Sequence, residues 1–134
     1  MMTKKEFLEI VSRKANIDIA DAERITSAVF QTLRSQLSRE ESVDIMLNLP
    51  EDIENIWEGN WLQKLTSLLQ SFREMDKDEF IEQIREAADI RTSKEAELVA
   101  EVVFNTLKAA IPPREVEHIS RDLPDNLKDL WKAA

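Results

Sequence analysis

Hydrophobic residues recur along the chain at helical spacing, and the same pattern occurs twice. The first half opens on an apolar face spaced i, i+1, i+4, i+8, made by Phe7, Leu8, Val11 and Ala15. The second half repeats this face 73 residues later, with Phe80, Ile81, Ile84 and Ala88. No alternation of apolar and polar residues typical of strands is present. The pattern therefore predicts an all-α protein built from two similar halves.

A longer apolar stripe follows in each half and predicts the longest helix of that half. Its members are four residues apart: Ile25, Val29, Leu33 and Leu37, then Val99, Val103, Leu107 and Ile111, now at an offset of 74 residues. Each half closes on a Leu-Pro segment that ends in tryptophan, at Trp57 and at Trp131. We expect both rings to be buried because an indole covers a large apolar area. The pattern thus predicts four helices in each half.

Residues that cap helices stand at the predicted starts. Thr3 with Glu6 and Ser38 with Glu41 have the spacing of a capping box, in which the acid reaches back to the first free N–H. Pro112 and the proline after it hold the place of Ser38 in the second half, where a missing N–H costs nothing. Acids at such positions, including the pair Glu40 and Glu41, are expected to be solvent-exposed.

A further helix is predicted between the halves. Its apolar stripe includes Trp61, Leu65, Leu68 and Phe72. The predicted organisation is a first repeat over 1–58, a connector helix over 59–75 and a second repeat over 76–134, pseudo-symmetric and packed as one compact bundle. The connector stripe either fills the space between the repeats or forms an interaction surface.

Composition excludes several kinds of chemistry. The 134 residues include no Cys and one Gly, which removes thiol nucleophiles, Cys-type zinc sites and glycine-rich nucleotide loops. The net charge of −9 repels nucleic acid and anionic membranes. No apolar run long enough for a signal peptide or a membrane span is present, so we expect a cytoplasmic protein.

One pair of residues has metal-ligand spacing. Glu115 and His118 form a Glu-x-x-His motif that places a carboxylate and an imidazole on one helical face. The equivalent of His118 in the first half is Asp44, and no second histidine exists. Two ligands leave most of a coordination sphere empty. The sequence therefore favours a role for Glu115 at the positive end of the helix dipole and a surface position for His118. It predicts no catalytic residue and no cofactor, and it disfavours an enzyme.

The repeated motifs resemble a bacterial family called domain of unknown function 2267. They are Glu6-Phe7-Leu8, Ala22-Glu23, Val29 to Leu33 and Leu49-Pro50 to Trp57, with their counterparts in the second half. The resemblance spans nearly the whole chain and implies two helical copies. It transfers no catalytic or ligand residue, because these motifs serve packing and capping.

Three classes of function follow from the sequence. The favoured one is a non-enzymatic helical module for protein interaction or regulation, which binds an unknown protein or associates with itself, for example as a homodimer. The first alternative is a metal-binding or metalloenzyme-like bundle that uses Glu115 and His118. The second is a helical DNA-binding protein, which the net charge of −9 disfavours.

Overall fold

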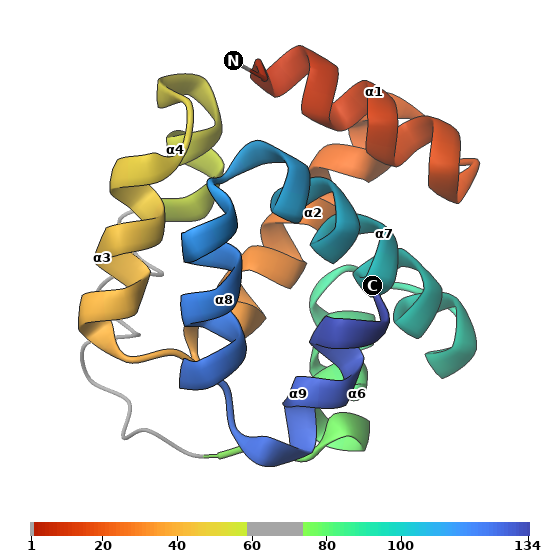
Figure 1. Ribbon diagram of the computed structural model, residues 1–134. Coiled ribbons are helices and arrows are strands. Elements are labelled where there is room, and N and C mark those ends of the chain that lie inside the picture. The colour runs from red at the N-terminus through yellow and green to blue at the C-terminus, as the bar shows by residue number, and fades with distance from the viewer. Residues whose placement is uncertain (1, 59–73) are drawn as a thin grey trace.

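The computed structural model describes residues 2–58 and 74–134, which form helices joined by short turns (Figure 1). The helices are α1 (Lys4–Ala15), α2 (Ile19–Arg34), α3 (Arg39–Asn48), α4 (Glu51–Glu58), α6 (Lys77–Ala87), α7 (Ser93–Ala110), α8 (Pro113–Asp122) and α9 (Asp125–Ala133). No strand occurs in these two ranges, which confirms the all-α prediction. The predicted connector helix, with Trp61, Leu65, Leu68 and Phe72, lies outside the described residues.

The helices begin at the capping residues that the sequence indicated. Thr3 Oγ1 accepts a hydrogen bond from the Glu6 N–H at 3.1 Å, and Ser38 Oγ accepts one from the Glu41 N–H at 3.2 Å. Pro112 precedes α8 without a side-chain cap, and a second proline is the first residue of that helix. The long stripes lie in α2 and α7, which have 16 and 18 residues. Local side-chain chemistry therefore determines most of the helix starts.

Aromatic side chains fill the core in two matching groups. Phe30 lies between Phe7 and Trp57, with ring centroids 5.7 and 5.3 Å away and near edge-to-face geometry. An equivalent group is made by Phe80, Phe104 and Trp131. Trp57 and Trp131 are each 1% exposed, so the prediction that both rings are buried is confirmed.

Helices of the first half pack against helices of the second. α1 contacts α7, α2 contacts α6, and α3 contacts α8. Figure 1 shows α3 and α8 side by side and antiparallel. The Ser38 N–H at the start of α3 donates to Asp122 Oδ2 at the end of α8, at 2.7 Å. In the predicted two-copy register α3 and α8 are equivalent helices, and α1 with α7 corresponds to α6 with α2, which is the reciprocal pattern expected of a two-fold relation.

Candidate metal centre

Three side chains with metal-binding atoms converge where α3 meets α8. Glu41 comes from α3, and Glu115 and His118 come from α8. One ligand atom from each lies within 4.8 Å of the other two. His118 Nδ1 is 3.5 Å from Glu115 Oε1. The structure thus brings together the pair that the sequence singled out and adds a third residue from the other half of the chain.

Both carboxylates of this cluster are buried. Glu41 is 8% exposed and Glu115 is 2% exposed. Among the described residues, Glu41 Oε1 and Glu115 Oε2 have no hydrogen-bond partner. The expectation that acids at helix starts are solvent-exposed is therefore wrong for Glu41, because α8 covers the first turn of α3. Glu115 lies in the first turn of α8, as its predicted dipole role requires, and is buried as well.

At the starts of α3 and α8 the backbone N–H of the capping residue does not bind the capping acid. In α1 the capping acid still has a partner at the cap, since the Thr3 hydroxyl donates to the Glu6 carboxylate at 3.3 Å. At α3 the backbone N–H of Ser38 donates to Asp122 instead of the capping acid. At α8 the cap is Pro112, which has no N–H to offer. Neither buried acid has a capping N–H to bind.

Burial and repulsion from nearby acids act on the titration of Glu41. The pKa of Glu41 is raised from 4.5 to about 7, mainly by desolvation and next by repulsion from the neighbouring Glu115 carboxylate, while His118 opposes the change. Asp44 and Asp122 add smaller repulsions. A carboxylate pair of this kind needs a positive charge beside it, since removing an ion from water is costly unless it is paired. That charge is supplied by a proton or by a metal cation.

The donor atoms of the cluster suit a divalent transition metal. Carboxylate oxygens bind most divalent ions, but an imidazole nitrogen favours Zn²⁺, Fe²⁺ or Co²⁺ over Ca²⁺ and Mg²⁺, which prefer oxygen alone. Three protein ligands leave at least one position for water in a tetrahedral or larger shell. The His118 side chain is 43% exposed, so solvent and ions can reach the cluster from its side.

The comparisons with known proteins identify the family of the chain but do not test the candidate metal centre. The profile of the family described as "Uncharacterized conserved protein (DUF2267)" matches residues 4–132. The chain belongs to this family. The resemblance inferred from the repeated motifs is thereby confirmed for domain of unknown function 2267 proteins. A search of curated proteins finds no match. None of the described helices is both long and apolar enough to cross a lipid bilayer.

Glu41 is the candidate ligand that the sequence analysis did not identify, although a signal for it was present. The register that pairs Asp44 with His118 also pairs Glu41 with Glu115. Each predicted copy therefore contains a Glu-x-x-acid or Glu-x-x-His motif at the same place, and the contact between α3 and α8 brings the two glutamates together. The missing information was that these two helices, far apart in sequence, lie against each other. Asp44 is exposed and is not part of the cluster.

Proposed function

We propose that this helical protein binds a divalent transition-metal ion between α3 and α8, through Glu41, Glu115 and His118. The observation that carries the proposal is the pair of buried carboxylates, each with an oxygen that no described residue hydrogen-bonds. Such a pair destabilises the fold unless a cation or a proton lies beside it. The half-exposed imidazole at the edge of the pair supplies the third donor.

The role of the ion is structural and regulatory. Two ligands come from one helix and one from another, so the ion would link α3 to α8 and thereby the two halves of the chain. An ion that binds the folded state alone adds RT ln(1 + [L]/Kd) to the stability, which makes the fold depend on metal supply. The ligands need only small side-chain rotations to approach a common ion, because they already lie within 4.8 Å of one another.

Calorimetric titration of the chelator-treated protein with Zn²⁺, Co²⁺ and Mn²⁺ tests the proposal. We expect one ion per chain, with Zn²⁺ and Co²⁺ bound more tightly than Mn²⁺. Glu41→Gln, Glu115→Gln and His118→Gln should each weaken Zn²⁺ binding by about tenfold or more, because each removes one ligand at nearly constant volume. The absorption spectrum of bound Co²⁺ should change in the same variants.

Glu117→Gln is the matched control, because Glu117 lies on the same helix and its side chain is 66% exposed. It should bind Zn²⁺ as the unaltered protein does. The proposal fails if no stoichiometric ion binds, or if the three ligand variants and the control lose the same affinity. Equal losses would indicate attraction of the ion to the overall negative charge.

The interaction role favoured by the sequence is a second proposal, supported by exposed apolar residues on α3. The apolar stripe of the predicted connector helix, which the sequence suggested as an interaction surface, lies outside the described residues. The cytoplasmic location also stays a prediction.

A further inference from the structure

Two large apolar side chains on the outer face of α3 are exposed to solvent. Val43 is 43% exposed and Leu47 is 73% exposed. They are four residues apart and therefore lie one turn apart on the same side of the helix. We call these two residues the α3 patch. The other exposed large apolar residues in the described ranges, Ile19 and Leu98, lie apart from each other on α2 and α7.

The equivalent face of α8 provides an internal comparison. In the two-copy register, Val43 corresponds to Glu117 and Leu47 to Arg121. Those two residues form an exposed ion pair, with Arg121 Nη2 at 2.8 Å from Glu117 Oε1. A polar i,i+4 pair is the ordinary solution for a helix face in water. The fold does not require apolar residues here, so their presence on α3 calls for another reason.

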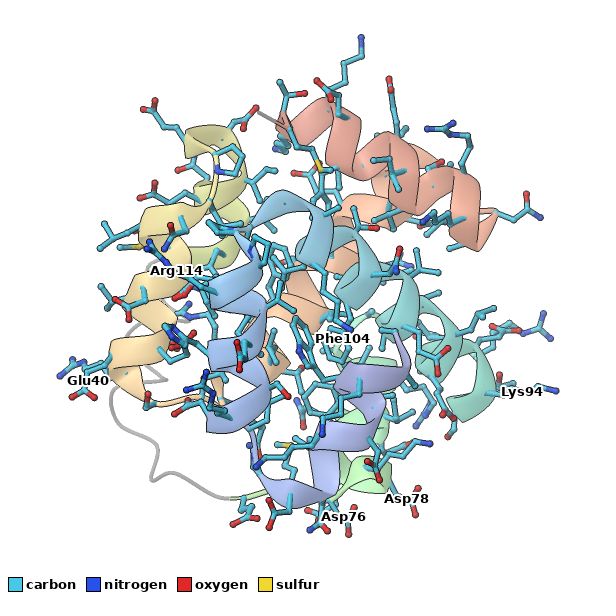
Figure 2. The ribbon with its side chains drawn as sticks, viewed as in Figure 1. Glu40, Asp76, Asp78, Lys94, Phe104 and Arg114 are labelled. Atoms are coloured by element: carbon cyan, nitrogen blue, oxygen red, sulfur yellow. The ribbon has the colours of Figure 1, made fainter. Side chains whose placement is uncertain are left out.

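The exposed charged residues of α3 itself are mainly acidic. Glu40 and Asp44 lie beside the α3 patch and are exposed, and Glu51 begins the next helix four residues after Leu47. Figure 2 shows Glu40 projecting from α3 away from the body of the protein. Arg39 is the single basic residue of α3. With a net charge of −9 for the whole chain, this surface attracts cations and repels acidic partners.

We propose that the α3 patch docks a basic amphipathic helix of another protein, whose apolar side chains cover Val43 and Leu47 while its lysines or arginines face the acidic residues around them. Apolar anchors at i and i+4 match the spacing with which one helix packs on another. The charges around the anchors select the partner and speed the encounter. This docking uses the outer face of α3 and does not depend on metal at the α8 side.

The test is the affinity of a labelled synthetic helix of leucine and lysine, measured by fluorescence anisotropy at physiological salt. The key variant is Val43→Glu with Leu47→Arg, which transplants the ion pair of α8 onto α3. It leaves the net charge at −9, so general attraction of the basic peptide is unchanged. We expect the double variant to weaken peptide binding by about tenfold or more, since central apolar anchors carry most of the affinity.

Two controls separate the α3 patch from other exposed apolar residues and from folding effects. Leu98→Gln, at a position 55% exposed on α7, should leave the peptide affinity unchanged. Leu47→Gln, at the most exposed apolar position, should weaken binding without changing the helical circular dichroism. A peptide of leucine and glutamate with the same apolar face should not bind.

Three results would overturn the docking proposal. The first is equal peptide affinity in the double variant and the unaltered protein. The second is a dimer of the unaltered protein that the double variant converts to monomer, which would assign the patch to a second copy. The third is a marked loss of thermal stability in the double variant, which would mean that the chain itself covers these side chains.

Discussion

The replacement Glu41→Gln should stabilise the metal-free protein at neutral and alkaline pH. The amide has nearly the same size as the carboxyl group and carries no charge, so it removes the repulsion from Glu115 while it keeps the packing of α3 on α8. The cap of α3 is unaffected, because the hydrogen bond to Ser38 Oγ comes from the backbone N–H of residue 41. The expected gain is the free energy that the buried charge costs the fold.

The size and sign of this gain follow from the pKa of Glu41, which rises from 4.5 to about 7 on folding. The folded state holds its proton more tightly than the unfolded chain, so stability falls as pH rises between these two values and is level above them. The full difference is about 3 kcal/mol. Solvent that enters beside His118 screens part of it, so we expect about 2 kcal/mol.

Urea denaturation followed by circular dichroism, in the presence of a chelator, measures this effect. At about pH 8, Glu41→Gln should be more stable than the unaltered protein by about 2 kcal/mol, and at about pH 5 the difference should fall below about 1 kcal/mol. Glu40→Gln, at the exposed neighbouring position, should change stability by less than about 0.5 kcal/mol at either pH. If Glu41→Gln is the less stable protein at about pH 8, the carboxylate makes a stabilising contact and the reasoning is wrong.

Three further changes test other parts of the structure. Asp44→His would complete a second Glu-x-x-His motif. Native mass spectrometry should then detect tighter Zn²⁺ binding or a second bound ion. Unchanged Zn²⁺ binding would count against a two-fold axis between α3 and α8. Trp57→Ala and Trp131→Ala should each cost about 3–5 kcal/mol in urea denaturation, and a large difference between them would contradict equivalent packing. Asp122→Ala should lower the free energy of unfolding by about 1 kcal/mol in the same assay, because it removes the acceptor for the Ser38 N–H at the start of α3. An unchanged free energy of unfolding would mean that water replaces the Asp122 carboxylate.

The fold was largely predictable because its signals are local. Apolar spacing identifies the buried face of each helix, and residues such as Thr3 and Ser38 mark where the helices begin. Trp57 and Trp131 could be assigned to the core since rings of that size are rarely left in water. Each of these patterns involves only a few neighbouring residues, so it can be recognised in the sequence without knowing which helices pack together.

The candidate site was only partly predictable because it depends on a contact between distant segments. Glu115 and His118 are three residues apart and could be paired from spacing. Glu41 is 74 residues from Glu115, and its place in a capping box suggested that its side chain was already engaged. That interpretation omitted Asp122, which accepts the hydrogen bond from Ser38 and leaves the Glu41 carboxylate free. Competition for one N–H is a tertiary effect that sequence spacing does not reveal.

The predicted duplication also explains why both proposals fall on α3 and α8. A residue near a two-fold axis lies against its own counterpart in the other copy. One glutamate in an ancestral copy would therefore give two facing carboxylates after duplication. Two buried carboxylates repel each other, and this arrangement favours a bound cation. Positions away from the axis are free to diverge, and the outer faces differ in this way: an ion pair on α8 and apolar residues on α3. The proposed metal site therefore lies on the inner face, where the two halves would share one ion, and the proposed docking surface lies on the outer face of α3, where the two halves differ.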